Sequence, residues 1–117
     1  MSSNDCVLCA LLHRHSKGDA GIKVVYESEY SLALYATEPF AEVHILVLSK
    51  KHIPSIFDVD ENDNMLVGDI WKAIKAASEE VYALKGACKL EMYIGKFPTF
   101  TAVKHFHCHV IYDSSVD

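Results

Sequence analysis

Three histidines alternate with other residues near the end of the chain, in the stretch KHFHCHVIY from Lys104 to Tyr112. A neutral imidazole can bind a metal ion, transfer a proton, or attack a phosphorus atom and form a covalent intermediate. Because successive side chains of a β-strand point to opposite faces, we expect His105, His107 and His109 to share one face of a sheet. The residues between them are expected to pack under a helix on the other face.

The spacing of these histidines limits what they can do together. Alternate side chains on one strand are about 7 Å apart, whereas a metal–nitrogen bond is about 2.0–2.1 Å long. Three consecutive imidazoles of one strand are therefore too widely spaced to bind a single ion comfortably. We expect the three histidines to have different roles, and the middle one, His107, has the best support from its neighbours for nucleophilic attack.

A second group of candidate ligands lies at the start of the chain, where Cys6 and Cys9 form a Cys-x-x-Cys pair. This spacing is typical of metal sites and of redox-active pairs. A redox motif of this kind normally opens a helix after a strand in a parallel βαβ unit, and no such strand is predicted before Cys6. His13 and His15 follow within six residues of Cys9, so a purely local metal site is an alternative.

The composition limits the classes of function. The chain has 117 residues, 50% of them hydrophobic, which suits one compact domain, residues 1–117. Its formal net charge of −5 makes nucleic acid an unfavourable partner. The longest apolar run, residues 45–48, is far too short to cross a membrane, and the start MSSND does not resemble a signal peptide. We therefore expect an intracellular, cytoplasmic protein with no membrane partner.

The apolar pattern predicts the elements that position these side chains. The expected strands are Ile22–Tyr26, Ser31–Tyr35, His44–Leu48, Lys89–Gly95 and His105–Tyr112. Apolar residues at three- and four-residue steps predict one long helix over Glu61–Leu84, with Asp60 as its N-cap and Gly86 as its stop. A short helical turn is expected around Cys6–Leu12. The predicted class is α+β, with a five-stranded, mostly antiparallel sheet and the long helix on one face.

Three stretches resemble the histidine-triad (HIT) family. The stretch HFHCHVI is similar to the family signature of three histidines alternating with apolar residues. The stretch EVHILVLSKKHIPSI, residues 42–56, resembles a second family block, and CVLC resembles the family's N-terminal cysteine pair. The three blocks occur in the family's order and together extend over nearly the whole chain. The resemblance implies a HIT-like fold.

The resemblance also implies roles for the histidines. In HIT proteins the middle histidine of the triad takes up a nucleoside phosphoryl group, which implies His107 as the nucleophile. His109 is expected to support it and to contact the phosphate or the leaving group, and His44 is expected to lie beside the site. Members with the cysteine pair bind a structural zinc ion. The positions that match its ligands are Cys6, Cys9, His52 and His105.

The loop before the triad departs from the family pattern. Many members have a glutamine and a hydroxyl residue there to hold the phosphate, whereas this chain has FTAVK at residues 100–104. Thr99, Thr101 and Lys104 are the candidates for phosphate and nucleotide binding that this stretch offers. Ala36 occupies the position where close relatives often have an Asp or Asn that holds the ribose hydroxyls.

The function implied by the resemblance is that of a nucleotidyl hydrolase or transferase of the phosphoramidase or dinucleotide hydrolase type. It would act on the α-phosphorus of a purine nucleoside phosphate ester or phosphoramidate through a covalent histidine intermediate. The family also implies a homodimer. One alternative is a nucleotide-binding module with little turnover, because of the altered loop. Another is aprataxin-like removal of AMP from nucleic-acid ends, because FPTFTAVKHFHCHVIYDSS looks somewhat like that branch.

Overall fold

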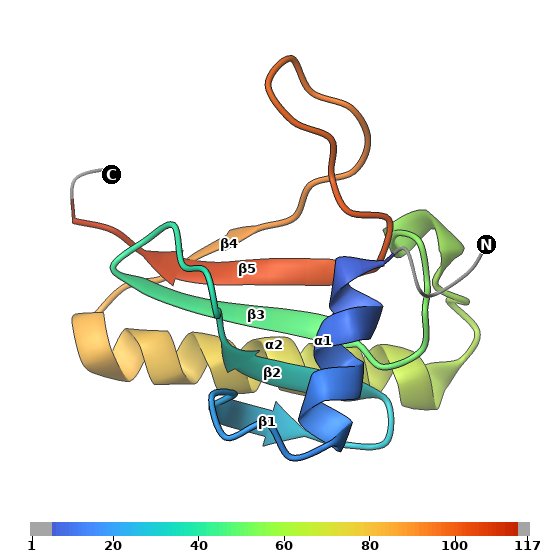
Figure 1. Ribbon diagram of the computed structural model, residues 1–117, viewed down its shortest axis with the longest axis horizontal. Coiled ribbons are helices and arrows are strands. Elements are labelled where there is room, and N and C mark those ends of the chain that lie inside the picture. The colour runs from blue at the N-terminus through green and yellow to red at the C-terminus, as the bar shows by residue number, and fades with distance from the viewer. Residues whose placement is uncertain (1–5, 115–117) are drawn as a thin grey trace.

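A computed structural model describes residues 6–114 and has a five-stranded antiparallel sheet with a helix on each face (Figure 1). The strands are β1 Val24–Glu27, β2 Ser31–Tyr35, β3 Val43–Ser49, β4 Lys89–Glu91 and β5 His107–Tyr112. Their order in the sheet is β1-β2-β3-β5-β4. The helices are α1 Val7–Ser16 and α2 Asn64–Lys85, with a short 3-10 helix, η2, at Ile56–Asp58. The predicted α+β class, with a five-stranded antiparallel sheet, one long helix and a short N-terminal helix, is confirmed.

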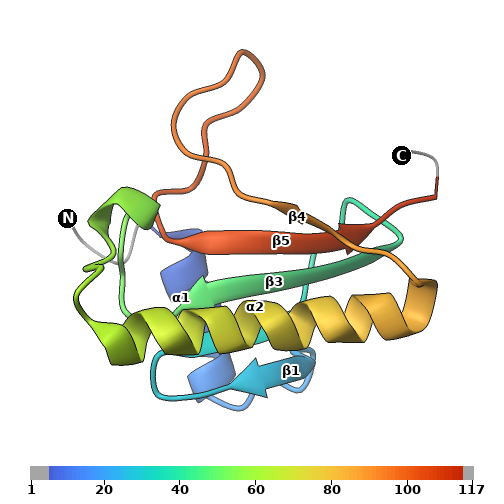
Figure 2. The same cartoon turned by 180° about the vertical axis from the view of Figure 1, so that it is seen from behind.

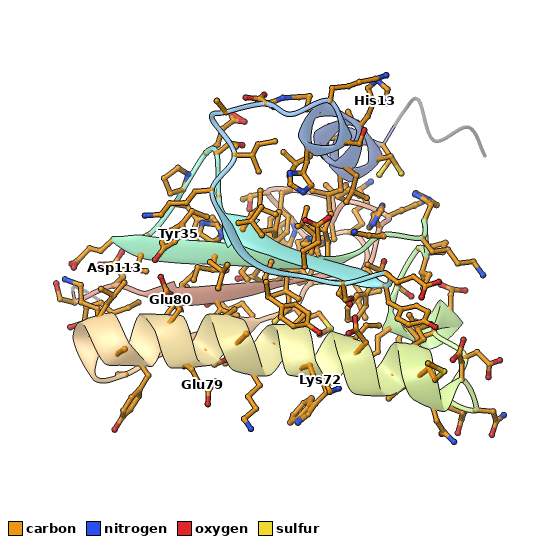
Figure 3. All side chains as sticks on the ribbon, turned by 90° about the horizontal axis from the view of Figure 1, so that it is seen from below. His13, Tyr35, Lys72, Glu79, Glu80 and Asp113 are labelled. Atoms are coloured by element: carbon orange, nitrogen blue, oxygen red, sulfur yellow. The ribbon has the colours of Figure 1, made fainter. Side chains whose placement is uncertain are left out.

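The two helices pack on opposite faces of the sheet (Figures 2 and 3). The long helix α2 covers the face that carries Phe106, Cys108 and Val110, as expected from their alternation with the histidines. Leu8 and Leu11 of α1 pack on the other face, against leucines of β2 and β3. The histidine-bearing face of β5 therefore lies on the α1 side of the sheet.

The start of the long helix was predicted wrongly. Helix α2 begins at Asn64 rather than Glu61, because Asp63 and not Asp60 is its N-cap. The carboxylate of Asp63 accepts a backbone N–H of the first turn at 3.1 Å, whereas Asp60 accepts a backbone N–H in the preceding turn at 2.9 Å. The stop at Gly86 is confirmed, with a left-handed φ of 77° that favours glycine. No helix within residues 6–114 is long and apolar enough to cross a membrane.

The last two strands are shorter than predicted. Strand β4 ends at Glu91, and the chain leaves the sheet until His107, where β5 begins. His105 therefore precedes the strand, so the prediction that all three histidines lie in one strand was wrong. A tight turn replaces the sheet hydrogen bonds there, because the N–H of His105 donates to the carbonyl of Val103 at 2.9 Å. Strand β2 has its predicted bounds, and the bounds of β1 and β3 differ slightly from the predicted ones.

The segment between β4 and β5 forms a loop that rises away from the sheet (Figure 1). An isolated bridge pairs Lys96 with Thr101, and the N–H of Phe97 donates to the carbonyl of Phe100 at 2.8 Å. These bonds close the tip of the loop into a tight turn. The altered FTAVK stretch runs from this tip back to the histidines. The loop therefore lies beside His107.

Candidate active site and metal centre

Four predicted metal ligands from three separate segments meet at one end of the sheet. Cys6 is the N-cap of α1 and Cys9 lies in the first turn of that helix. His52 follows β3, and His105 precedes β5. The Sγ atom of Cys6 lies 3.3 Å from Nδ1 of His105. The Sγ atom of Cys9 lies 3.2 Å from Nδ1 of His52, and the four ligand atoms all lie within 4.8 Å of one another.

The distances and donor types of this cluster fit a tetrahedral ion. Tetrahedral bonds of about 2.3 Å to sulfur and 2.0–2.1 Å to nitrogen separate the two ligand atoms by about 3.5 Å. The Nε2 atom of His105 lies 2.7 Å from the carbonyl oxygen of Ser49. Because a carbonyl only accepts, Nε2 carries the proton and the Nδ1 lone pair faces the two thiols. The four residues can therefore hold a metal ion through two sulfur and two nitrogen atoms.

A cation would be needed to keep these thiols ionised. Burial, together with the adjacent thiol of Cys6, raises the pKa of Cys9 to about 11. A thiolate is the form that binds metal, and a positive ion offsets the cost of forming it in a buried position. Two thiolates and two neutral imidazoles leave no coordination position for substrate, so such a centre is of the closed, structural kind.

The residues of the alternative local metal site, His13 and His15, do not lie beside Cys6 and Cys9 in one cluster. His13 is exposed on α1 and points away from the sheet (Figure 3). The Nε2 atom of His15 lies 2.9 Å from the carboxylate of Glu27 instead. Within residues 6–114, the cluster of Cys6, Cys9, His52 and His105 is the one group of three or more such side chains close enough to hold a metal.

His107 is oriented by the backbone at the start of β5. Its Nδ1 atom lies 2.5 Å from the carbonyl oxygen of His105. The carbonyl only accepts, so Nδ1 carries the ring proton and Nε2 keeps its lone pair. The residue is 7% exposed, and it borders a cavity that His109 shares. The ring is therefore held in the tautomer that a nucleophile acting through Nε2 requires.

His44 of β3 and His109 of β5 form a second hydrogen-bonded pair. The backbone N–H of Phe40 donates to Nδ1 of His44 at 3.2 Å, so the proton of a neutral His44 is on Nε2. That Nε2 atom lies 2.9 Å from Nδ1 of His109. His109 must therefore accept at Nδ1 and carry its own proton on Nε2. This series of fixed tautomers leaves the Nε2–H group of His109 available as a hydrogen-bond donor.

The pKa values of this pair agree with neutral rings. Burial, together with the charges that His107 and His44 would carry, lowers the pKa of His109 to about 4. Burial also lowers the pKa of His44. The carboxylate of Glu91 opposes both shifts, and burial dominates. Both rings are neutral near pH 7, as the bonds from Phe40 to His44 and from His44 to His109 require.

We expect acid to destabilise the fold through this pair. The pKa of His109 is about 4 in the folded chain, against an ordinary value of 6.5. The unfolded chain therefore binds more protons between these values, and the free energy of unfolding falls as the pH decreases from about 6.5 to about 4. Urea unfolding across this range should show a weaker dependence in His109→Asn than in the wild type or in His13→Asn, a change at an exposed histidine. Equal pH dependence in all three would contradict the expectation.

Two cavities lie beside His109. One, of about 420 Å³, is bordered by His107, His109, Phe40, Tyr93, Phe100 and Thr101, among others. The other, of about 280 Å³, lies on the α1 side and is bordered by His44 and His109 together with Arg14, Ala36, Thr37 and Glu38. Phe40 borders both. We call the first the aromatic cavity and the second the polar cavity.

The three candidates for phosphate binding lie in different places. Thr101 borders the aromatic cavity with His107 and His109. Lys104 instead borders an adjoining cavity of about 210 Å³, which His105, His107 and Thr101 border as well. Thr99 is exposed near the tip of the loop between β4 and β5. Of these three residues, Thr101 is the one that adjoins both histidines.

Sequence reasoning missed two aromatic residues that border the site. The ring of Phe40 lies 4.3 Å from that of His44 and 5.2 Å from that of His109, measured between centroids. The ring of Tyr93 lies 5.9 Å from that of His109. Phe40 precedes His44 by four residues in a loop, which is a position with no periodicity to interpret. The concentration of aromatic residues in the loop before the triad was the available signal for Tyr93.

Comparison with curated proteins finds distant relatives. Adenylylsulfatase HINT3 from Arabidopsis thaliana is 22% identical over 109 residues, which cover 92% of this chain and 52% of that protein. The chain thus spans about half the length of this relative. An uncharacterized HIT-like protein from Borreliella burgdorferi is 27% identical over 108 residues, which cover 92% of this chain and 74% of the relative.

Solved structures and a family model complete the comparison. A zinc-bound histidine triad family protein from Mycobacterium smegmatis is 26% identical, with a TM-score of 0.72 over 99% of this chain and 80% of that one. A HIT family hydrolase from Clostridium thermocellum is 25% identical, with a TM-score of 0.74 over 97% of this chain and 94% of that one. The family model described as "Scavenger mRNA decapping enzyme C-term binding" matches residues 5–117. The chain therefore belongs to this family and is a HIT-like protein.

Proposed function

We propose that the protein is a nucleotide hydrolase or transferase in which His107 attacks the α-phosphorus of a nucleoside phosphate ester or phosphoramidate. The observation that carries this proposal is the bond from Nδ1 of His107 to the carbonyl of His105, because it leaves a lone pair on Nε2 beside a cavity. The family membership supports it, as do relatives named as a hydrolase and an adenylylsulfatase.

The reaction follows from the two fixed tautomers. The Nε2 lone pair of His107 forms a bond to phosphorus, and the bond from phosphorus to the leaving atom breaks. The electron pair stays on the leaving atom, which takes a proton from water. The resulting hydroxide then displaces His107 from phosphorus, so one water molecule is consumed overall. The Nε2–H group of His109 and the hydroxyl of Thr101 are the donors that would stabilise charge on the phosphoryl oxygens.

The nucleoside is proposed to occupy the polar cavity. This cavity adjoins His109 and is bordered by Ala36, the position at which relatives often bind the ribose hydroxyls. Glu38 borders the same cavity and offers a carboxylate acceptor for those hydroxyls. Arg14 also borders it, with its guanidinium paired to Asp19 at 2.9 Å. A purine nucleoside monophosphate derivative is accordingly the proposed substrate class.

The cluster of Cys6, Cys9, His52 and His105 is proposed to bind a structural zinc ion. Zinc would neutralise the two thiolates and hold the first turn of α1 against the segments that carry the histidines. The zinc-bound relative from Mycobacterium smegmatis supports zinc as the metal. The ring of His105 would then be fixed at the metal while its carbonyl orients His107.

Trapping the covalent intermediate tests the function directly. Wild-type protein mixed with an adenosine phosphoramidate and quenched in alkaline denaturant should gain the mass of one nucleotidyl group, and peptide mapping should locate it on His107. Free AMP should accumulate over repeated turnovers. AMP alone serves as the control and should give no adduct. Release of AMP with no adduct at any time would contradict the covalent route.

A binding module with little turnover is the second candidate, and the altered loop is the observation that favours it. Of the three predicted phosphate contacts, Thr101 shares a cavity with both His107 and His109, Lys104 shares one with His107, and Thr99 borders neither. Calorimetric binding of AMP without release from any conjugate would favour this candidate. The net charge of −5 disfavours binding to nucleic acid, and therefore disfavours an aprataxin-like activity.

A homodimer is also proposed from the family resemblance. Trp71 is 67% exposed and Val67 is 40% exposed on α2, which offers apolar surface for a second copy. Light scattering coupled to size exclusion measures this directly.

A further inference from the structure

The two cysteines of the metal cluster are placed so that they can also bond to each other. Cys6 is the N-cap of α1, with an extended backbone, and its Sγ atom accepts the N–H of Cys9 at 3.3 Å. The two Sγ atoms lie within 4.8 Å of each other. Residues three apart at the start of a helix face each other. Because Cys6 lies outside the helix, its side chain can turn toward Cys9 without breaking a backbone hydrogen bond of α1.

The pair can be reached by a small oxidant through one of its members. Cys6 is 5% exposed, whereas Cys9 is partly exposed in the first turn of α1. A thiolate is the reactive form of cysteine, and a metal ion keeps its sulfur ligands in that form. Cys9 is therefore the sulfur of the cluster that a peroxide molecule would meet first.

A disulfide between these cysteines excludes the metal ion. The sulfur atoms of a disulfide carry no charge, whereas the thiolate is the form that binds metal. Among residues 6–114, the cluster contains no His, Cys, Asp or Glu besides Cys6, Cys9, His52 and His105. Two neutral imidazoles would then remain, and structural zinc sites have four ligands. Formation of the disulfide would therefore release the ion.

Helix α1 crosses the strands of the sheet and is attached near both ends (Figure 1). At its N-terminal end, the Sγ atom of Cys9 lies 3.2 Å from Nδ1 of His52. At its C-terminal end, Nε2 of His15 lies 2.9 Å from the carboxylate of Glu27. Loss of the ion would remove the first attachment and leave the second, so the first turn of α1 is the part that would loosen.

The first turn of α1 and the cluster both adjoin the proposed nucleotide site. Val7 and Leu8 of that turn border the polar cavity, which we propose holds the nucleoside. The carbonyl of His105 accepts a hydrogen bond from Nδ1–H of His107. A change at the two thiols therefore reaches the nucleoside pocket through α1 and the nucleophile through the backbone of His105.

We propose that Cys6 and Cys9 form a peroxide-sensitive switch, in which their oxidation to a disulfide releases the metal ion and weakens nucleotide binding. The release of the ion rests on the proposed metal centre alone, and only the effect on nucleotides rests on the proposed function. The switch would make the affinity for nucleotides depend on the supply of oxidant.

The oxidation proceeds in two steps. The thiolate of Cys9 attacks one oxygen of hydrogen peroxide, and the oxygen–oxygen bond breaks. The sulfur becomes a sulfenic acid, and the departing hydroxide takes a proton to form water. The thiolate of Cys6 then attacks the sulfur of Cys9, the sulfur–oxygen bond breaks, and a second hydroxide leaves as water. Two electrons pass from the thiolates to the peroxide, and a dithiol reverses the change by thiol–disulfide exchange.

Zinc release and disulfide formation can be measured together on the zinc-loaded full chain. Hydrogen peroxide is added in the presence of a chromogenic zinc indicator, and samples are analysed by intact mass and by peptide mapping without reductant. We expect one zinc ion to be released for each disulfide formed, with the mass falling by two hydrogen atoms. The disulfide should map to Cys6 and Cys9. Dithiothreitol followed by zinc should restore the starting protein.

The affinity for AMP measures the effect on the nucleotide site. Calorimetry should give a Kd for AMP about tenfold higher for the oxidised protein than for the reduced, zinc-loaded protein. Reduced protein stripped of zinc by a chelator should bind AMP as weakly as the oxidised protein, because the ion holds the first turn of α1. Unchanged AMP affinity in either the oxidised or the stripped protein would overturn this effect.

Two variants identify the sulfurs that respond. Cys88→Ser is the matched control, because Cys88 is a free, partly buried cysteine outside the cluster. It should release zinc and lose AMP affinity on oxidation as the wild type does. Cys9→Ser removes one partner of the disulfide, so peroxide should leave its AMP affinity at the value measured before treatment. A peroxide response in Cys9→Ser equal to that of the wild type would contradict the switch.

The outcomes distinguish this inference from the proposed function. Zinc that stays bound after peroxide treatment, or a disulfide that includes Cys88 or Cys108, would overturn the switch, whether or not the protein releases AMP from its substrates. If no form of the protein binds AMP, the proposed function and the effect on nucleotides both fail. Zinc release with a disulfide between Cys6 and Cys9 would then still support the redox chemistry of the pair.

Discussion

Replacing His107 with alanine should lower AMP release from an adenosine phosphoramidate by at least about 10³-fold, because it removes the atom that we propose bonds to phosphorus. The loss should appear in kcat, since the nucleoside contacts proposed for the polar cavity do not involve His107. Steady-state assays with saturating substrate measure this, and calorimetry with AMP should still detect binding.

The matched control is His13→Ala, because His13 is an exposed histidine of α1 that points away from the sheet. This variant should retain wild-type turnover. Circular dichroism and thermal unfolding of His107→Ala should show that the fold persists, so that a loss of activity can be attributed to the nucleophile. Turnover within tenfold of wild type in folded His107→Ala would rule out His107 as the attacking group.

The double variant Cys6→Ser/Cys9→Ser should lose one equivalent of zinc and much of its thermal stability. A ligand present at 1,000 times its dissociation constant stabilises a folded protein by about 4 kcal/mol. For a domain of this size, that corresponds to a fall in Tm of roughly 10–20 °C. Elemental analysis of the purified protein and calorimetric unfolding measure the two effects.

Two further variants identify the ligands. Cys88→Ser changes a free cysteine outside the cluster and should keep both the zinc and the Tm. His105→Ala should lose zinc if the ligands come from distant segments, whereas a local site with His13 or His15 would retain it. One equivalent of zinc in the double cysteine variant would contradict the proposed centre.

Much of the fold can be predicted from the apolar pattern of the chain. The alternation around His107 correctly predicts which face of β5 packs under α2, because a strand has a strict two-residue period. The helical period correctly predicts a long helix that ends at Gly86, where a left-handed φ is needed. Patterns of this kind are reliable when one face of an element is buried along its whole length.

Local competition explains what the pattern could not predict. Asp60 and Asp63 are both suitable N-caps, and only the path of the preceding turn decides between them. The alternation of His105 with Phe106 continues the period of a strand, yet the backbone turns before β5 so that the ring can reach the thiols. At His105, the contact of the ring with the thiols coincides with a departure from the strand pattern.

The candidate site could be predicted only in part from the sequence, for a similar reason. The three alternating histidines and the cysteine pair stand out by their spacing, whereas His44, His52 and the four-ligand set are implied by the family resemblance. The distances agree with these clusters. Phe40 and Tyr93 lie in loops, and their contacts with His109 depend on how those loops return to the sheet. No periodic pattern in the sequence predicts the path of such a loop.

One residue belongs to both centres, and this has a thermodynamic consequence. The ring of His105 faces the thiols, while its carbonyl accepts a hydrogen bond from Nδ1–H of His107. An ion held at the ring restricts the carbonyl, and a reaction that changes the charge on His107 changes the strength of that same hydrogen bond. Such coupling is reciprocal. If the proposed ion changes the affinity of the site for AMP by some factor, AMP must change the affinity for the ion by the same factor.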